Sequence, residues 1–319
     1  MAIYLGIDGG GTKTTCVLAD ERGIVGTATC SGSNITRLGE ARVREALHAA
    51  VREACAAAKV KPSQIASACI GLSGAGRPEV RDVIAGIMRE VLEGRIDVVS
   101  DLETTLEAAF GGGPGVIVIA GTGSIAYGRD AHRRTARAGG WGLAISDEGS
   151  GQWIGRAAVS AVLNANDAGE NPPLLQTILS LWKLTSLDEL VRYANASPPP
   201  DFSSLVPTIL FAAESPENPR PSRAWTGHPR DPVAESVLRR AGSELAALAR
   251  NVIRRLFGSE VSVPVAMTGG VFRQSERVRQ VFYNGVIAEF PRASVHPVVV
   301  DPVEGALALA RKALAGPSQ

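Results

Sequence analysis

The chain has 319 residues, 45% hydrophobic, 5% aromatic and 20% charged, with a formal net charge of +1. Its length and hydrophobic content suffice for a sizeable core and predict about two domains. The near-neutral charge, the few aromatic residues and the lack of a polybasic run argue against a nucleic-acid partner. No apolar stretch approaches the ~20 residues of a membrane span, and the sequence opens directly on a predicted strand without a signal-peptide pattern. We therefore expect neither a nucleic-acid nor a membrane partner.

The first hundred residues alternate between predicted strands and predicted helices. Strands are predicted near 3–8, 14–19, 24–30, 66–72 and 96–100, and helices near 39–58 and 78–91, with another over 102–110. Such alternation is typical of an α/β sheet covered by helices.

A second sheet is predicted to begin at Gly115, after a glycine-rich segment that suits a domain boundary. Residues 147 to about 258 are mostly helical in pattern, interrupted by a polar, proline-rich stretch at 215–230 that we expect to be a surface insertion. Further elements are a helix with Asp231 as N-cap and Pro232 at its first position, a strand at 263–268 leading into Gly269, and a last helix that begins at Asp301 and Pro302 and ends at Gly316.

The four cysteines, Cys16, Cys30, Cys55 and Cys69, lie on apolar stretches and show no metal-ligand spacing. This pattern predicts buried, reduced thiols and a cytoplasmic protein.

Two glycine-rich turns each follow a predicted buried strand and precede another strand-like run. The first is Gly9–Gly10–Gly11–Thr12, and the second is Gly121–Thr122–Gly123–Ser124. Glycine lacks a Cβ atom, so such a turn can adopt positive φ angles and bring its N–H groups close to an anion. Taken alone, either turn is better explained as a plain hairpin than as a phosphate site. Because the unit occurs twice, we expect a polyphosphate held between two similar halves.

Neither turn matches a common phosphate motif. Thr12 interrupts the Walker A spacing before Lys13, and the β-branched residues that follow favour a strand rather than a helix. The segment from Gly121 fits the loose dinucleotide fingerprint, but it continues into strand-like sequence and lacks an acidic residue about 20 positions later.

Two aspartates end predicted strands. Asp101 follows the strand at 96–100, and ligands of open α/β sheets bind beyond the carboxyl ends of strands. Its alternative role is the N-cap of the helix at 102–110, and the two roles can coexist. Asp8 ends the first strand beside the first glycine turn. A carboxylate next to phosphates is unfavourable without a cation between them, so Asp8 is a candidate Mg²⁺ contact through water.

A third cluster contains Gly140–Trp141–Gly142 and, a few residues later, Asp147. The indole face suits the apolar C–H face of a sugar, and the carboxylate could accept hydrogen bonds from sugar hydroxyls. The alternative is a loop leading into a helix whose dipole the acidic residues complement. Asn34, in a polar segment after the third strand, is a weaker sugar-site candidate and could equally be a loop residue.

Taken together and in order, these motifs resemble the N-acetylglucosamine kinase group of the actin/hexokinase/Hsp70 ATPase superfamily. The segments that carry the resemblance are Asp8–Thr14, Leu72–Gly76, Ser100–Asp101, Ala120–Ser124, Gly139–Gly142 with Asp147–Ser150, and Thr268–Val271. The resemblance implies two actin-like (ribonuclease H-like) α/β domains with ATP and Mg²⁺ in a cleft between them. The domains would be 1–113, completed by a helix at 302–319, and 114–301.

The resemblance also implies an activity and a set of roles. The activity is ATP-dependent phosphorylation of an amino sugar, N-acetylglucosamine at its 6-hydroxyl, with Asp101 as the catalytic base. The implied ATP contacts are Gly10, Gly11, Thr12, Lys13, Gly121, Thr122, Gly269 and Gly270, and the implied sugar contacts are Asn34, Asp101, Ser124, Gly140, Trp141, Gly142 and Asp147. With an ordinary carboxyl pKa near ~3.9, Asp101 would be a weak base for an alcohol. Kinases of this group often dimerise, so a homodimer is expected.

One residue departs from the pattern and leaves the acceptor open. The animal N-acetylglucosamine kinases have an asparagine, which helps to hold the sugar, where this chain has Ile125. Glucosamine and N-acetylmuramic acid therefore remain alternative acceptors.

Two other functional classes share the predicted fold. The activator ATPases of 2-hydroxyacyl-CoA dehydratases share the fold but hold an iron–sulfur cluster on cysteines, and no cysteine here follows the second glycine turn. A non-catalytic ATP-dependent binder is also compatible with the fold, although the sugar-site cluster favours catalysis.

Overall fold

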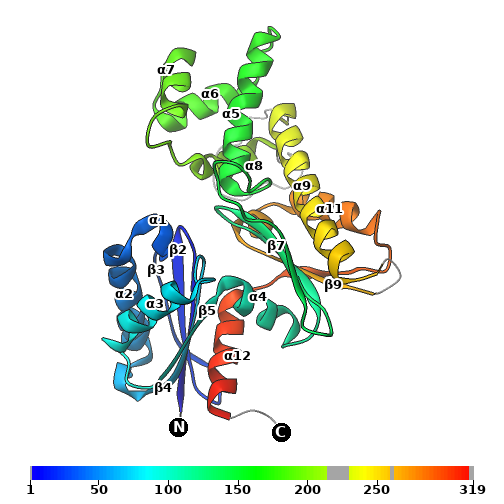
Figure 1. Ribbon diagram of the computed structural model, residues 1–319. Coiled ribbons are helices and arrows are strands. Elements are labelled where there is room, and N and C mark those ends of the chain that lie inside the picture. The colour runs from blue at the N-terminus through cyan, green and yellow to red at the C-terminus, as the bar shows by residue number, and fades with distance from the viewer. Residues whose placement is uncertain (1, 214–229, 259–261, 316–319) are drawn as a thin grey trace. The chain divides into compact units, whose positions relative to one another are not determined.

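The computed structural model describes residues 2–213, 230–258 and 262–315 (Figure 1). The protein is α/β with two sheets, as predicted, and each sheet has five strands. The chain divides into two compact units. Unit 1 comprises residues 1–117, 128–134 and 300–319, and unit 2 comprises residues 118–127 and 135–299. Apart from Arg230, the predicted insertion at 215–230 lies outside the described residues, as does Gly316, the predicted end of the last helix.

The first sheet has the strand order β3-β2-β1-β4-β5. Its strands are β1 (Ile3–Gly9), β2 (Lys13–Ala19), β3 (Ile24–Ser31), β4 (Ile65–Leu72) and β5 (Arg95–Ser100), each within one residue of its prediction. The β1, β2 and β3 strands pair antiparallel, whereas β4 pairs parallel with both β1 and β5. Gly9 lies opposite Leu72, which lies opposite Ser100, so the carboxyl ends of β1, β4 and β5 meet at one edge of the sheet.

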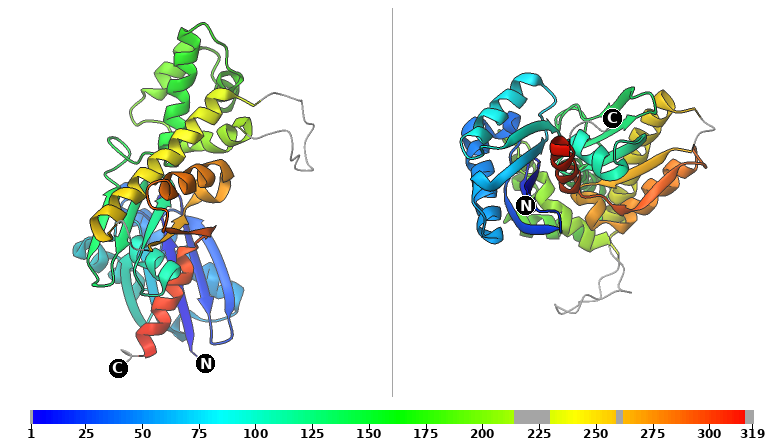
Figure 2. Two further views of the ribbon diagram at one scale, coloured as in Figure 1. Left: turned by 90° about the vertical axis from the view of Figure 1, so that its right-hand side faces the viewer. Right: turned by 90° about the horizontal axis from the view of Figure 1, so that it is seen from below.

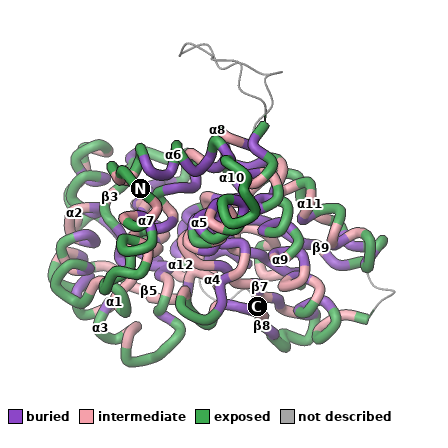
Figure 3. Tube along the Cα trace, turned by 90° about the horizontal axis from the view of Figure 1, so that it is seen from above, coloured by how far each residue is buried: buried purple, intermediate pink, exposed green. Residues whose placement is uncertain are grey.

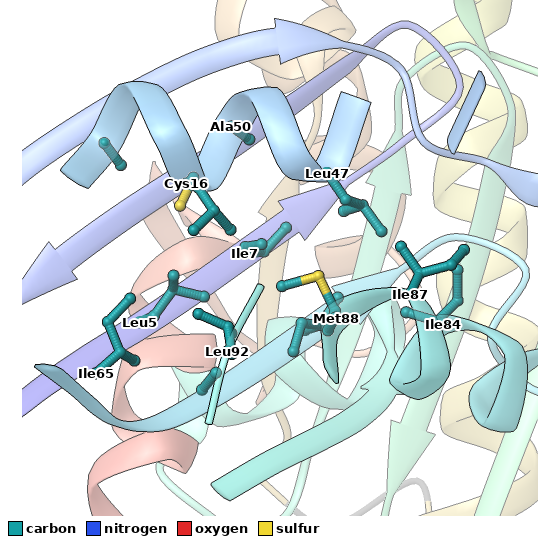
Figure 4. Packing of buried hydrophobic residues seen from close by; sticks show 14 of the residues in the cluster. Leu5, Ile7, Cys16, Leu47, Ala50, Ile65, Ile84, Ile87, Met88 and Leu92 are labelled. Carbon is teal, nitrogen blue, oxygen red and sulfur yellow. The ribbon is translucent and has the colours of Figure 1, made fainter. Parts of the chain in front are cut away.

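Helices α2 (Glu40–Ala58) and α3 (Pro78–Arg89) cover one face of this sheet. Figure 4 shows Ile7 of β1 beside Leu47 of α2 and Met88 of α3, in a buried cluster that also contains Leu5 of β1 and Ile87 of α3. Full burial of one such side chain contributes ~1.5–3 kcal/mol. The buried positions of α2 recur every three or four residues, which is the helical period that predicted the element.

The opposite face is covered by α12 (Pro302–Ala315), which also lies beside α4 (Asp101–Phe110) (Figure 1). Val303 and Leu307 of α12 pack against the second strand, and Ala306 and Ala310 pack against Cys69 of β4. The two helices approach closely because α12 carries Gly305, where a Cβ atom would lie 1.9 Å from the carbonyl oxygen of Thr104. A residue with a Cβ atom would not fit at this position.

The second sheet has the order β10-β9-β6-β7-β8. Its strands are β6 (Gly115–Ala120), β7 (Ser124–Arg129), β8 (Thr135–Gly139), β9 (Pro264–Thr268) and β10 (Ser294–Val299). The helices that follow β8 are α5 (Gly151–Asp167), α6 (Pro173–Trp182), α7 (Leu187–Ala194), α8 (Val206–Ala213), α9 (Pro232–Leu256), α10 (Gly270–Gln274) and α11 (Glu276–Ile287), which confirms the helical middle. The long helix α9 runs beside α11 (Figure 2), and Figure 3 shows buried and exposed residues alternating along it.

Strands β8 and β10 were not predicted, and both are edges of the second sheet. An edge strand has a neighbour on one side only, so little of it needs to be apolar. None of the six residues of β10 is buried, and Pro297 lies within it, as an edge position allows.

The cysteine prediction is correct for three residues and wrong for one. Cys16, Cys55 and Cys69 are buried and free, whereas Cys30 is partly exposed because it lies on the edge strand β3. Burial raises the pKa of Cys69 to about 12, so this thiol stays protonated at neutral pH. No described helix has the length and apolarity that a membrane crossing requires.

Candidate active site

Asp101 occupies the first position of α4, so its alternative role as the N-cap is not supported. Ser100 is the N-cap, and its hydroxyl accepts the N–H of Glu103 at 3.4 Å. The Glu103 carboxylate in turn accepts the N–H of Ser100 at 3.4 Å, which completes a capping box. Because Ser100 satisfies the helix end, the Asp101 carboxylate is available for other partners.

The Asp101 carboxylate has a raised pKa. The hydroxyl of Ser73 and the backbone N–H groups of Leu102 and Asp101 itself donate hydrogen bonds to it. Burial outweighs these bonds and raises the pKa from 3.8 to about 6. The expectation of an ordinary carboxyl pKa was therefore wrong, because burial is a tertiary effect that position in the sequence does not reveal.

Asn34 joins Asp101 through the same serine. Its Nδ2 donates to Ser73 Oγ at 3.3 Å, while its Oδ1 caps the short helix α1 (Ile35–Leu38) by accepting the Arg37 N–H at 3.2 Å. The Ser73 backbone is fixed as well, since its N–H donates to the Gly9 carbonyl at 2.9 Å. Asn34, Ser73 and Asp101 thus form a hydrogen-bonded series at the carboxyl edge of the first sheet. We call it the serine relay.

Ser73 was not among the predicted site residues. The available signal was its place in the turn after β4, directly beyond Leu72, which pairs with Ser100. Seeing its role required the parallel register of β4 and β5, which brings the two strand ends together.

The first glycine turn is a β1–β2 hairpin, as predicted. The Gly10 N–H donates to the Lys13 carbonyl at 2.9 Å, and the Gly10 carbonyl accepts the N–H of Ser33 at 3.0 Å. The Thr14 hydroxyl, 2.8 Å from Ser33 Oγ, ties the base of the hairpin to the same segment. Thr12 and Lys13 at its tip are exposed, and Gly11 is partly buried.

Asp8 lies on β1 just before this hairpin and is partly buried. No group of three or more histidine, cysteine or acidic side chains that could hold a metal occurs within 2–213, 230–258 and 262–315. One carboxylate ligand is too few for a metal that is held by protein side chains alone. It does suit Mg²⁺ bound chiefly by water and nucleotide phosphates, since this ion needs only one or two carboxylates.

The second glycine turn joins β6 to β7 and rests on the start of α5. The Gly121 N–H donates to the Gly123 carbonyl at 2.9 Å, and the Gly121 carbonyl accepts the N–H of Gly151 at 2.8 Å. Thr122 is partly exposed. Gly269, at the end of β9, lies against the residue that precedes this turn, because a Cβ atom there would be 2.3 Å from the Ala120 carbonyl oxygen. The predicted residues Gly121, Thr122, Gly269 and Gly270 are thus brought together at the ends of two strands.

Ser124 is buried, and its hydroxyl donates to the Glu148 carbonyl at 2.7 Å. This bond joins the start of β7 to the loop that carries Asp147. The Ser124 backbone also hydrogen-bonds the Asp147 carboxylate. Ser124 therefore positions Asp147, whatever contact it makes with a ligand.

Asp147 is a buried carboxylate, 6% exposed, whose Oδ1 has no hydrogen-bond partner among the described residues. Its backbone has φ +66°, a left-handed conformation that is uncommon outside glycine. Burial raises its pKa, against backbone hydrogen bonds from Gly142 and Ser124. A buried acceptor without a donor is costly in a folded protein and suggests that a ligand supplies the donor.

The dipole alternative for Asp147 is not supported. Helix α5 begins at Gly151 with Ser150 as its N-cap, and its first turn contains no acidic residue. Instead the carboxylate lies against the second glycine turn, where a Cβ atom on Gly123 would be 2.6 Å from Asp147 Oδ2.

The predicted Gly140–Trp141–Gly142 segment forms a surface turn. Trp141 is 62% exposed, and the flanking glycines have φ +69° and +105°, angles that other residues rarely adopt. The guanidinium carbon of Arg137 lies 3.9 Å from the centroid of the Trp141 ring. Ile125, the residue that departs from the animal pattern, packs under the turn, since a Cβ atom on Gly140 would be 2.6 Å from its Cδ1.

Comparisons with known proteins agree with this arrangement. The sequence is 31% identical to an N-acetylmuramic acid/N-acetylglucosamine kinase of Clostridium acetobutylicum over 98% of this chain and 99% of that protein. It is 28% identical to an N-acetyl-D-glucosamine kinase of Dictyostelium discoideum over 97% of each chain. A solved structure of a candidate N-acetylglucosamine kinase from Chromobacterium violaceum matches with a TM-score of 0.74 and 28% identity, over 97% of this chain and 99% of that one.

A family match covers more than half of the chain. Residues 5–172 match the BadF/BadG/BcrA/BcrD ATPase family, and this stretch contains both glycine turns, the serine relay and Asp147. The chain therefore belongs to the BadF/BadG/BcrA/BcrD ATPase family.

Proposed function

We propose that the chain is an ATP-dependent kinase that phosphorylates the 6-hydroxyl of an amino sugar, with N-acetylglucosamine as an acceptor. The observation that carries this proposal is the serine relay, which presents a carboxylate of pKa about 6 at the carboxyl edge of a parallel sheet region. The names of the two curated relatives support the choice of acceptor.

Asp101 is proposed as the catalytic base. The sugar oxygen bonds to the γ-phosphorus of ATP, the bond to the ADP oxygen breaks, and the hydroxyl proton passes to the Asp101 carboxylate. A loose phosphoryl-transfer transition state requires mainly positioning and charge stabilisation. With a pKa about 6, Asp101 is ionised at pH 7 and is a stronger base than an ordinary carboxylate. An alcohol is a far weaker acid, so we expect the proton to move late.

ATP is proposed to bind through the two glycine turns. In unit 1 the phosphate contacts are Gly10, Gly11, Thr12 and Lys13, and in unit 2 they are Gly121 and Thr122, with Gly269 and Gly270 lining the adenosine. Asp8 would contact Mg²⁺ through water. The bound ion would neutralise charge that develops on the phosphates.

Sugar recognition is proposed for the remaining predicted residues, Asn34, Ser124, Gly140, Trp141, Gly142 and Asp147. The strongest support concerns Asp147, whose buried Oδ1 lacks a donor that a sugar hydroxyl can supply. The exposed indole of Trp141 offers an apolar surface to the C–H face of the ring. Asn34 would contact the sugar from the end of the serine relay opposite Asp101.

We further propose that the enzyme acts in the cytoplasm as a homodimer. The free thiols suit a reducing compartment. The dimer follows from the resemblance to sugar kinases of this group, and sedimentation velocity of the purified chain tests it.

The function is tested by ADP release with ATP, Mg²⁺ and a panel of sugars: N-acetylglucosamine, glucosamine, N-acetylmannosamine, N-acetylmuramic acid and glucose. We expect an N-acetylated amino sugar to stimulate ADP release well above the rate with ATP alone, with the product identified as a 6-phosphate by NMR. If no sugar in the panel stimulates ADP release, the kinase assignment is wrong.

A further inference from the structure

The Arg137 guanidinium is stacked on the exposed indole of Trp141, the proposed sugar contact. The 3.9 Å separation is shorter than that of the other stacked pairs among the described residues, Arg240 over Trp153 at 5.1 Å and Arg311 over Tyr4 at 5.7 Å. The stacking places a positive charge directly at the Gly140–Trp141–Gly142 turn.

This cation differs from the other two in its partners. Arg240 pairs with Glu244 at 3.6 Å, and Arg311 donates to the Asp20 carbonyl at 2.9 Å. In the described part of the chain, no carboxylate forms an ion pair with the Arg137 guanidinium, which lies over the indole. Stacking uses the face of the guanidinium and leaves its in-plane N–H donors available.

The backbone beneath this cation is fixed. The Arg137 carbonyl accepts a hydrogen bond from Arg255 Nη1 at 2.7 Å, and Arg156 Nη1 donates to the Leu143 carbonyl at 3.0 Å within the following loop. These bonds bring two more guanidinium groups to the segment that includes Trp141. The acidic groups of this loop are Asp147, which is buried, and Glu148, whose Oε2 accepts the Ser146 hydroxyl. The exposed rim of the turn is therefore cationic.

The hydroxyl and acetamido oxygens of a neutral amino sugar can accept only uncharged, single hydrogen bonds from this cation, whereas a carboxylate carries the opposite charge and fits a guanidinium fork through two parallel hydrogen bonds. We propose that Arg137 is a specificity-determining residue, which favours acceptor sugars carrying a carboxylate substituent over neutral ones. The substrate class is an N-acetyl amino sugar with a carboxylic-acid side arm, such as N-acetylmuramic acid. The inference rests on the proposed function, because it requires the acceptor to bind at the Trp141 turn.

Steady-state kinetics of the full chain with ATP and Mg²⁺ test the inference by changing both the acceptor's carboxylate and the Arg137 side chain. The acceptors are N-acetylmuramic acid, its methyl ester, which lacks the negative charge, and N-acetylglucosamine. For the wild type we expect kcat/KM to be highest for the acid and to fall with added salt for the acid alone. Arg137→Gln should lower the acid-to-ester ratio of kcat/KM by roughly tenfold or more, the loss of one charge-assisted hydrogen bond. Arg137→Lys keeps the positive charge but not the forked geometry, so its acid-to-ester ratio should lie between those of the wild type and Arg137→Gln.

Arg240→Gln is the matched control, because it removes a cation that is stacked on a tryptophan but already paired with a carboxylate. It should leave the acid-to-ester ratio at the wild-type value. The inference is wrong if Arg137→Gln leaves the acid-to-ester ratio within about twofold of the wild-type value. It is also wrong if the wild type phosphorylates N-acetylglucosamine but not the acid. Either result leaves the kinase assignment standing. If none of the three acceptors is phosphorylated, the proposed function itself fails.

Discussion

Each unit of the molecule contains one carboxylate that is proposed to contact the sugar, and these two carboxylates differ in how many hydrogen bonds they receive. Asp101 of unit 1 accepts bonds from Ser73 and from the first N–H groups of α4. Asp147 of unit 2 sits on a loop at φ +66° and has an oxygen without a donor in the described structure. Burial raises both pKa values, so neither charge is well solvated.

The difference separates a preorganised group from one that its ligand completes. The donors to Asp101 come from a strand end and a helix, which are rigid elements and keep a base in place between turnovers. Asp147 has a strained backbone conformation and a carboxylate oxygen without a donor. A bound sugar hydroxyl would supply that donor. Substitutions at the two sites should therefore change different measured quantities.

The largest expected effect is that of Asp101→Asn. Loss of the base should lower turnover by about 10²–10⁴, with nucleotide affinity nearly unchanged. The matched control is Asp97→Asn on the preceding strand, where the carboxylate forms an exposed ion pair with Arg95. Rates of ADP release and titration calorimetry with an ATP analogue measure the two quantities. Turnover above roughly a third of wild type would remove Asp101 from the catalytic role, since general-base contributions are far larger.

Asp147→Asn should weaken sugar use but stabilise the fold. We expect kcat/KM for the sugar to fall about 10- to 100-fold, through loss of a charged acceptor. Melting temperature at pH 7 should rise, because asparagine tolerates the left-handed backbone and carries no buried charge.

Asp130→Asn is the contrasting control for that experiment. This equally buried carboxylate accepts bonds from the His132 and Arg134 backbone and from the Arg134 side chain. Its amide variant should lower the melting temperature. If both variants shift the melting temperature in the same direction, the distinction between a satisfied and an unsatisfied carboxylate is wrong.

The third effect concerns the turn above Ile125. Gly140→Ala should destabilise the protein by about 1–3 kcal/mol, since the backbone is left-handed and the new methyl group would overlap Ile125. Gly142→Ala meets no atom within 4 Å, so it should show the backbone cost alone. Chemical denaturation measures both. Adding Ile125→Ala should recover part of the Gly140→Ala loss and none of the Gly142→Ala loss, and equal recovery in both would contradict the packing described here.

The smallest effect is a shift in pH dependence caused by Ser73→Ala. The Ser73 hydroxyl bond lowers the pKa of Asp101, so its removal should raise that pKa above about 6. Because the ionised carboxylate is the base, activity is lost as the pH falls through this pKa, and the acidic limb of kcat should move to higher pH. Turnover should drop roughly threefold near pH 6 and little at pH 8. Ser67→Ala on β4 serves as control, and a limb that moves equally in both variants would exclude the serine relay.

Much of the fold was predictable from local pattern, and the exceptions share a cause. Strands with two neighbours, such as β1 and β4, are apolar along most of their length, and the period of α2 is visible in the sequence. The strands β8 and β10 need little apolar surface because each has one neighbour. Their pattern was therefore too weak to identify them.

The site was predictable as a set of positions rather than as an arrangement. Asp101 and Asn34 could be placed at strand ends, but their connection through Ser73 depends on register between distant strands. The pKa of Asp101 depends on burial, and the role of Ile125 depends on contact with Gly140. These are tertiary properties, which a motif does not encode locally.

The close contact of Gly305 with α4 has a consequence for the order in which the protein matures during synthesis. Helix α12 leaves the ribosome about 200 residues after α4, yet it covers the face of the first sheet that includes Cys69. Domains otherwise begin to fold as they emerge from the ribosome. Here the helix that begins with Asp101 acquires its packing partner only after about 200 further residues have been synthesised. A nascent chain would thus contain both glycine turns long before Asp101, the proposed base, is fixed in place.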